Sequence, residues 1–394
     1  MDSIPFVIDT LYALFAMTLV IFMVPGFAML EAGIVRTKNV TSVLTINILI
    51  YSIASLSFLL FGYSLAFGDF GSDNMSKYAT FLFQMAFVGK AINIISGGIS
   101  ERTRVVPLLL FTIIMGSILY PIAVNITWGT DFLKNTIFNI TIHDLAGSTV
   151  IHSTGGWALL AAILIIGARN GRYTKEGGIK VIPASNIPLV TLGAFLLWIG
   201  WFGFNGGSIG SMSSKENAEL VALTILNTNT AGLSGAIVVA IIMQIMFKKF
   251  DITMILNGAL GGLVSITAGA DLFNIYMPIL IGTIGGILVV FGVFMFDRFK
   301  IDDPVGALSV HLICGIWGTL AVGIFASNAD DITFLGQLKG VIVVGVFAFV
   351  GSYMVLYIIN KTVPLRVKKD QEIQGLDVEE CGLEAYPEFK RAFS

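Results

Sequence analysis

Charge, histidine and cysteine are scarce in this chain. Of its 394 residues only 12% are charged, three are histidine and two are cysteine, whereas 56% are hydrophobic and the mean hydropathy is +0.87. A soluble globular domain carries about 25% charged residues, so the composition excludes one. Cys314 falls in an apolar segment and Cys381 in a polar terminal segment, so we expect no structural disulfide between them. The chain is predicted to be a polytopic membrane protein.

The chain also lacks the marks of an enzyme or of a nucleic-acid-binding protein. Its net charge is −2, and no basic motif predicts a nucleic-acid partner. An intramembrane hydrolase would need a nucleophile beside its histidines or a triplet of metal ligands, and neither spacing is present. We therefore expect no enzymatic activity, no metal site and no cofactor.

Long apolar runs are what the chain has in abundance. A helix needs about 20 residues to cross a bilayer core about 30 Å thick. Runs of about this length predict an all-α protein with eleven transmembrane helices in residues 1–360, followed by a cytoplasmic tail at 361–394. The predicted spans are 8–32, 40–67, 78–99, 105–127, 142–167, 186–207, 219–247, 253–270, 276–296, 305–326 and 337–360.

Lysine and arginine predict the orientation of these spans. Most of the 23 basic residues follow the odd-numbered spans or lie in the tail. The opposite loops carry only Lys77, Lys134, Lys215 and Lys339. Because basic residues favour cytoplasmic loops, the N-terminus is predicted outside and the C-terminus inside.

One pattern occurs twice, as Asp144-x-x-Gly147-x4-His152-x3-Gly156 and as Asp303-x-x-Gly306-x4-His311-x3-Gly315. With an odd number of spans, the first copy opens its helix on the outer side and the second on the inner side. The alternative is a chance repetition. We interpret the pattern as the mark of two inverted five-helix halves followed by a final helix, with a functional site near the midplane where they meet.

His152 and His311 carry the chemistry of this repeat. Each lies about 12 Å along its helix from its aspartate, which places both near the centre of the membrane. A titratable ring there is costly unless it serves transport, and two such rings on related helices are expected to form a hydrogen-bonded pair that titrates as a unit. Gly156 and Gly315 follow on the same helix faces and are expected to permit close helix contact.

Several segments together resemble one family. They are residues 25–33 (PGFAMLEAG), 36–39 (RTKN), 97–104 (GGISERTR), 144–169, 200–208 (GWFGFNGGS) and the tail element at 375–386. In this order, over nearly the whole chain, they resemble the Amt/Mep ammonium transporters. The resemblance implies a homotrimer in the plasma membrane, with one pore in each eleven-helix protomer.

The resemblance also implies where ammonium enters. Trp128 and Ser208 end spans on the outer side and match the family's recruitment site. A tryptophan face attracts a cation, and a hydroxyl oxygen accepts an N–H. For Trp128 the alternative is an interfacial anchor. Phe87 belongs to the same entry site and forms, with Phe204, the family's stacked gate. Gln84 lies one turn before Phe87 and matches the family's Phe-Gln element.

His152 and His311 correspond to the family's twin histidines. Ammonium is expected to lose its proton below the gate. Ammonia then crosses the apolar pore, while the histidine pair either carries the proton or polarises the row of molecules through which the proton passes. This gives net electrogenic uptake and excludes potassium, which has no proton to give up. Asp144 is expected to order the vestibule, either as a helix cap or by direct contact with ammonium, and Asp303 is expected to be its structural counterpart.

Lys90 departs from the family, which usually has an apolar residue there. It lies three residues after Phe87, so its amine is placed either in the pore below the gate or at a helix interface. An amine in the pore would make the protein an ammonium sensor or gated receptor with little conduction. A Rhesus-type ammonia gas channel is a further alternative, although Trp128 and Ser208 favour the Amt branch.

The last expectations concern the cytoplasmic face. The loop 168–180 is basic, which fits either membrane topology or, as the resemblance implies, docking of a PII-type signal protein together with the tail. The tail itself is either a solvated end or an ordered regulatory segment.

Overall fold

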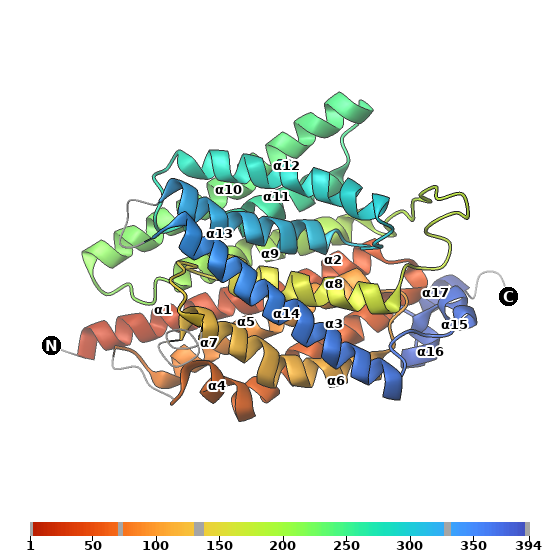
Figure 1. Ribbon diagram of the computed structural model, residues 1–394, viewed down its shortest axis with the longest axis horizontal. Helices are drawn as coiled ribbons and strands as arrows, with labels where there is room; N and C mark the ends of the chain where they lie inside the picture. The colour runs from red at the N-terminus through yellow and green to blue at the C-terminus, as the bar shows by residue number, and fades with distance from the viewer. Residues whose placement is uncertain (1–2, 70–73, 130–137, 327–331, 391–394) are drawn as a thin grey trace.

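Helices form nearly all of the secondary structure in the computed structural model, which describes residues 3–69, 74–129, 138–326 and 332–390. They run side by side along the long axis of the bundle (Figure 1). The chain starts at one end, here called the N-terminal face, and residues 363–388 lie at the other, here called the tail face. The α-helices of the bundle, in chain order, are α1 (Ser3–Ile21), α2 (Met23–Ile34), α3 (Val40–Ser57), α4 (Tyr63–Phe67), α5 (Lys77–Ile99), α6 (Val105–Ile114), α7 (Tyr120–Trp128), α8 (Thr154–Ile166), α9 (Ile187–Gly207), α10 (Lys215–Phe247), α11 (Ile252–Ile266), α12 (Met277–Arg298), α13 (Cys314–Phe325) and α14 (Phe334–Thr362).

Short helical pieces complete these segments. Four are π-helical turns continuous with a neighbouring helix, and three are short helices of the tail. The π-helical turns are η2 (Phe58–Gly62), η3 (Met115–Leu119), η5 (Ser148–Ser153) and η6 (Leu308–Ile313); a 3₁₀ turn, η1 (Thr37–Asn39), precedes α3; the tail helices are α15 (Lys369–Gln374), α16 (Leu376–Cys381) and α17 (Pro387–Lys390).

In the described part of the chain, ten helical segments are long and apolar enough to cross a membrane. They match ten of the eleven predicted spans. The span predicted at 253–270 is different, because α11 has only 15 residues. At 1.5 Å per residue it reaches about 22 Å, which is less than the thickness of a bilayer core. Helix α11 ends here, and the carbonyl groups that follow it bind another segment: Thr267 accepts a hydrogen bond from the backbone N–H of Ala146, and Ala268 accepts one from that of Leu145.

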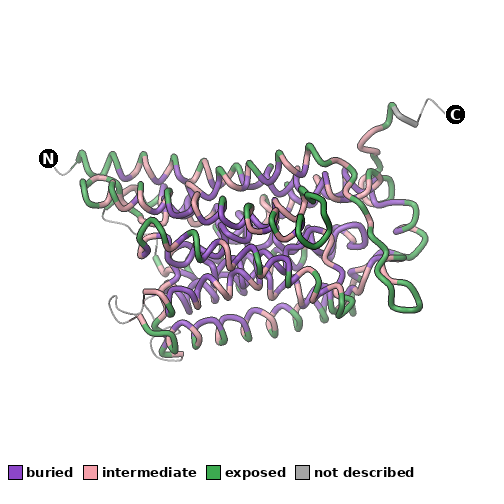
Figure 2. The backbone as a smooth tube through the Cα atoms, turned by 90° about the horizontal axis from the view of Figure 1, so that it is seen from above, coloured by how far each residue is buried: buried purple, intermediate pink, exposed green. Residues whose placement is uncertain are grey.

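The middle of the bundle is built from α5 and α8. In the spans that contain them, 78% of the most apolar window is buried, against 28% in α10 at the periphery. Figure 2 shows the buried backbone running through the centre and the exposed backbone around it. The periphery stays apolar, as Ile237, Ile241 and Ile245 on α10 show. Such a surface is suited to lipid, which is as apolar as these side chains.

The two copies of the repeat run in opposite directions. The first begins near the N-terminal face, and α8 brings it to the tail face, where Arg169 binds Asp302 at the start of the second copy. Thr149 at the start of the first copy lies 2.6 Å, hydroxyl to hydroxyl, from Thr319 in α13 of the second. The antiparallel arrangement predicted from the sequence is therefore the one seen.

Gly156 and Gly315 hold the two copies together. A Cβ on Gly156 would lie 2.8 Å from backbone atoms of Leu312 in η6, and one on Gly315 would lie 2.5 Å from the carbonyl oxygen of Ser148 in η5. Each glycine thus lets its helix approach the π-helical turn of the other copy. The close contact expected at these two positions is confirmed.

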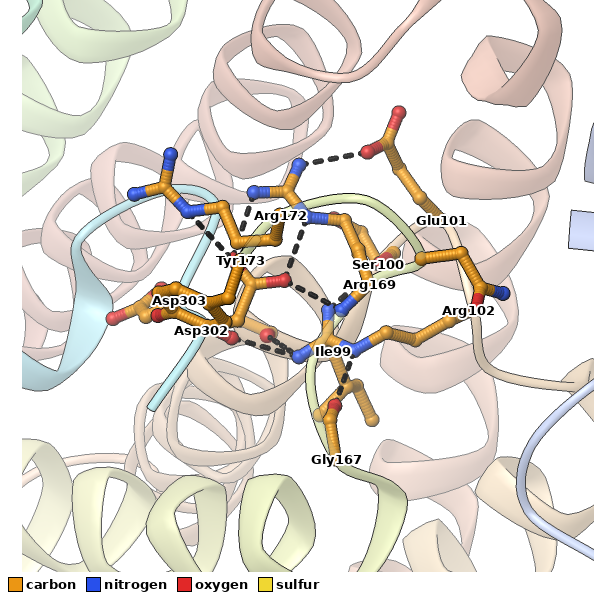
Figure 3. Close-up of polar contacts among 12 residues, drawn as sticks. Ile99, Ser100, Glu101, Arg102, Gly167, Arg169, Arg172, Tyr173, Asp302 and Asp303 are labelled. Carbon is orange, nitrogen blue, oxygen red and sulfur yellow. Dashed lines mark hydrogen bonds and ion pairs between the residues drawn. The ribbon is translucent and has the colours of Figure 1, made fainter. Parts of the chain in front are cut away.

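A buried ion cluster joins the loops at the tail face (Figure 3). The guanidinium of Arg169 forms two hydrogen bonds to the carboxylate of Asp302, at 2.8 and 2.9 Å, and one to Glu101 at 2.7 Å. Burial alone would raise the pKa of Glu101 and of Asp302, but Arg169 outweighs it, with Arg36 adding to its effect on Glu101, and both pKa values fall to about 2. The cluster fastens the α5–α6, α8–α9 and α12–η6 connections to one another.

The tail packs onto this face instead of extending from it. Asp377 accepts a hydrogen bond from the backbone N–H of Ser42 at 2.9 Å, at the start of α3. Glu380 accepts one from Val105 at the start of α6, and Glu372 accepts two from Asn170. Acidic side chains are favourable at helix N-termini, because free N–H groups point outward there. The described part of the tail is therefore ordered and not a solvated end, while its regulatory role stays a prediction.

Candidate functional site

A cavity of about 240 Å³ opens at the N-terminal face. Four of the residues selected from the sequence line it together: Gln84 and Phe87 from α5, Trp128 at the end of α7, and Ser208 just after α9. These residues are far apart in the chain, so the fold alone gathers them. The cavity wall is mostly apolar, with a few polar groups directed into it.

Hydrogen bonds hold the two polar members in place. The indole N–H of Trp128 donates to the backbone carbonyl of Asp144 at 2.6 Å. The hydroxyl of Ser208 donates to the carbonyl of Phe204 at 2.8 Å. Because this hydroxyl donates its single hydrogen within its own helix, its oxygen lone pairs are free to accept a hydrogen bond from a donor in the cavity.

Phe87 lines this cavity, and Phe204 packs against it. Their ring centroids are 4.5 Å apart, and their planes meet at 86°. The stacked arrangement expected from the family resemblance is wrong, since the rings meet edge to face. The ring quadrupole explains this geometry, because a positive edge against a negative face is favoured over a face-to-face sandwich. Both side chains are buried.

His152 and His311 follow directly below. Their Nδ1 atoms are 3.2 Å apart, and their rings are nearly parallel, with centroids 5.2 Å apart. His152 stacks against Phe204 with centroids 5.4 Å apart. The expected hydrogen-bonded pair is thus present in the structure, with one nitrogen donating and the other accepting. The Nε2 atom of His152 is buried and has no partner within the described residues.

Both histidines sit in π-helical turns, His152 in η5 and His311 in η6. A π-helical turn carries an extra residue and often marks a functional site. In each copy a glycine with positive φ precedes the turn, Gly147 at 111° and Gly306 at 78°. Positive φ lets the chain reverse sharply at the start of the segment, and it suits glycine because a Cβ would be strained there.

The two aspartates cap these turns. The carboxylate of Asp144 accepts hydrogen bonds from four backbone N–H groups, those of Gly147, Ser148, Thr149 and Val150. Asp303 does the same for its turn through Gly306 and Leu308, among others. Asp144 does not line the cavity, although the next residue, Leu145, does. The geometry therefore favours the cap over direct contact with ammonium for the Asp144 carboxylate. The backbone carbonyl of Asp144 positions Trp128.

Lys90 points toward α3. Its amine lies 5.5 Å from the centroid of the Tyr51 ring and has no hydrogen-bond partner within the described residues. The side chain is buried, and it lines neither the cavity at the N-terminal face nor the one at the tail face. The geometry favours the helix-interface alternative over an amine in the path.

A second, much smaller cavity of about 20 Å³ lies on the tail-face side of the histidines. His311, Phe27, Glu31 and Asn93 are among the residues that line it. Ring contacts therefore lead from one cavity to the other, from Phe87 through Phe204 and His152 to His311.

Sequence reasoning missed two residues of this site. Trp201 stacks against His152 with centroids 5.2 Å apart. It lies three residues before Phe204, so the helical period could have placed it on the same face. Glu31 was also missed. An acidic residue inside a long apolar run is a functional candidate in itself.

The fold and the site define a polytopic helical membrane protein in which two cavities are separated by phenylalanine and histidine rings in contact. Residues 11–386 match the Ammonium Transporter Family. The chain belongs to this family. A relative, ammonium transporter Amt2 of Archaeoglobus fulgidus, is 34% identical over 97% of this chain and 89% of its own length. Another, ammonium transporter Amt1 of Methanocaldococcus jannaschii, is 33% identical over 97% of both chains.

Solved structures agree with this assignment. One described as a "Sensor Amt Protein" superposes with a TM-score of 0.89 at 33% identity, covering 97% of this chain and all of the other. Mep2 of Candida albicans superposes with a TM-score of 0.83 at 24% identity, over 98% of this chain and 92% of the other, which shows a shared fold.

Proposed function

We propose that this protein takes up ammonium across the plasma membrane. Ammonium binds in the 240 Å³ cavity against Trp128 and Ser208 and loses its proton near Phe87 and Phe204. Ammonia and the proton then pass His152 and His311 separately. The single observation that carries the proposal is the unbroken series of ring contacts from the first cavity through the histidine pair to the second.

Energetics separate the proton from ammonia on this path. A full charge at the centre of a bilayer costs at least about 2.5–3.5 kcal/mol, and the histidine pair is enclosed by Phe27, Trp201 and Phe204. Neutral ammonia crosses this region at little cost, whereas the proton needs nitrogen atoms as stepping points. The Nδ1–Nδ1 contact supplies two of them. One charge is moved per ammonia, and potassium is rejected because it cannot release a proton.

Conduction is favoured over a purely sensory role. The amine of Lys90 faces Tyr51 and lies outside both cavities, so it does not obstruct the path. Trp128 and Ser208 together provide a binding site for a cation, which favours ammonium over dissolved ammonia gas as the species recruited.

The topology that we propose has eleven crossings, with the N-terminus outside. The two ends of the described chain lie at opposite faces of the bundle (Figure 1), which fits an odd number. The short helix α11 provides the one crossing that is needed besides the ten long segments. Most of its residues from Leu256 to Ile266 are buried within the protein, so it does not have to match the thickness of the lipid by itself.

Assembly and regulation are part of the proposal. The protein acts as a homotrimer, and a PII-type protein docks on the tail face, where the basic loop 168–180 and the tail lie together. A pull-down with purified PII-type protein tests this docking. Binding to the full chain that is lost on removal of residues 361–394 supports it, and equal binding to both overturns the role of the tail.

The transport proposal is tested with purified protein in proteoliposomes. We expect an ammonium jump to evoke a current, and we expect His152→Ala or His311→Ala to reduce it, because each removes one nitrogen of the pair. Phe349→Ala, which alters the packing against Trp157 away from the path, serves as the control. A folded wild-type protein that shows no current would contradict the proposal.

A further inference from the structure

The tail-face cavity contains a carboxylate that the transport scheme leaves without a role. Glu31 is 1% exposed and lies in α2, on the side of the histidines nearer the tail face. Its Oε1 accepts a hydrogen bond from the hydroxyl of Ser96 at 2.8 Å, and its Oε2 accepts one from the amide of Asn47 at 2.9 Å. No Lys, Arg or His in the described ranges lies within ion-pair distance of it.

Two neutral donors leave this carboxylate with acceptor capacity to spare. A carboxylate has about four lone-pair sites, and the two hydrogen bonds occupy two of them. An ionised carboxylate held by neutral groups in an apolar span is costly. Such a group gains by taking up a proton, and it is therefore suited to accept one and release it again.

Glycine keeps this carboxylate open to the cavity. Gly97 lines the same cavity, and a Cβ at this position would lie 3.2 Å from the carboxyl carbon and from Oε1 of Glu31. It would also lie 2.9 Å from a methyl carbon of Val305. Any side chain at position 97 would therefore cover the carboxylate on this side.

The volume of the cavity sets what can connect Glu31 to the histidines. Its 20 Å³ is about the space that one water molecule needs. His311 lines this cavity, and its Nδ1 is already engaged by His152. Its Nε2 is then the ring atom left to exchange a proton with a water. Asn93, which donates to Asn47, contributes a further polar group to the wall.

We propose that Glu31 is the proton-exit residue of the transport path, a role that rests on the proposed function. The N–H bond at Nε2 of His311 breaks as its proton joins the cavity water, and the water passes one of its own protons to Glu31. His152 passes its Nδ1 proton to Nδ1 of His311 and takes up, at its Nε2 atom, the proton that ammonium loses below Phe87. The neutral carboxyl group then protonates ammonia arriving from the pore, which regenerates the carboxylate and releases ammonium.

The test measures ammonium-evoked current in proteoliposomes as a function of internal pH. Glu31→Gln keeps the size of the side chain and removes its acidity. We expect the current to fall about a hundredfold or more, the lower end of what a positioned proton-transfer group contributes, and to lose its dependence on internal pH. Ser96→Ala is the matched control, because it removes one hydrogen bond to Glu31 and keeps the carboxylate. It should retain most of the current.

Chemical rescue separates proton transfer from a structural role. Glu31→Ala leaves room for a small acid, and formate inside the vesicles should restore part of its current, whereas chloride should not. This inference would be overturned if wild type conducts and Glu31→Gln shows the same current and the same dependence on internal pH. That outcome would leave the proposed function standing. A folded wild-type protein without current would overturn the proposed function, and the role of Glu31 with it.

Discussion

His152 and His311 lie 159 positions apart in the chain, yet their Nδ1 atoms are separated by only 3.2 Å. Each ring is carried by a π-helical turn that is capped by an aspartate and preceded by a glycine with positive φ. The two turns approach from opposite faces of the bundle. The contact therefore depends on both halves of the protein, and a change in either half should disturb it.

Trp128 should set the apparent affinity for ammonium. A cation over its ring gains about 0.5–2 kcal/mol, so Trp128→Leu should raise the half-saturating ammonium concentration about 2- to 30-fold. Trp128→Phe keeps an aromatic face but loses the hydrogen bond to Asp144, and we expect an intermediate value. The measurement is the concentration dependence of the evoked current. An unchanged affinity in Trp128→Leu would leave the ring as an interfacial anchor only.

Lys90→Ile should leave the transport rate nearly unchanged. The amine lies against Tyr51 and away from both cavities, so its loss should not widen the path. Removing a buried amine that lacks a hydrogen bond should also raise the melting temperature in detergent. Uptake and thermal unfolding of the two proteins test this. A large increase in uptake would show that the amine reaches the pore.

Arg169→Gln should destabilise the fold by about 3–5 kcal/mol, since it removes the guanidinium that two buried carboxylates share and leaves Glu101 with Arg36 alone and Asp302 with the more distant Arg172. The pKa values of Glu101 and Asp302 are lowered from 4.5 and 3.8 to about 2. Their contribution to stability is thus present above pH 4.5 and is lost as the pH falls toward 2. The difference in melting temperature between wild type and variant should be large at pH 7 and should shrink below pH 4.5. Lys175→Gln, on an exposed side chain of the same loop, is the control.

Gly315→Val should weaken the packing of the two halves. A Cβ at this position already lies 2.5 Å from the carbonyl oxygen of Ser148, and overpacking of this kind costs about 1–3 kcal/mol. We expect a lower melting temperature and a reduced current, because Ser148 begins the turn that holds His152. Gly351→Val, where a Cβ would meet only the flexible end of Leu119, should change both quantities much less. Equal effects of the two variants would argue against a special contact at Gly315.

The sequence by itself determined the class of fold, ten of the spans, the paired histidines and the two glycines beside them. These follow from local physics. Apolar length predicts a crossing, and an aspartate, a glycine and a histidine at equal spacing in two segments predict related turns. A structural role for Asp303, and a helix cap as one of two alternatives for Asp144, followed from the same reasoning.

Only the tertiary structure decided the rest. Whether Phe87 meets Phe204 by its edge, where the amine of Lys90 points and whether the tail docks all depend on contacts between segments distant in the chain. The short helix α11 is a further case, because its end is set by hydrogen bonds from Leu145 and Ala146. Glu31 shows the same limit most clearly. Its carboxylate acquires the proposed role only because α2, α5, α9, α11 and η6 enclose one small cavity, and no local pattern encodes a cavity formed by segments so far apart in the chain.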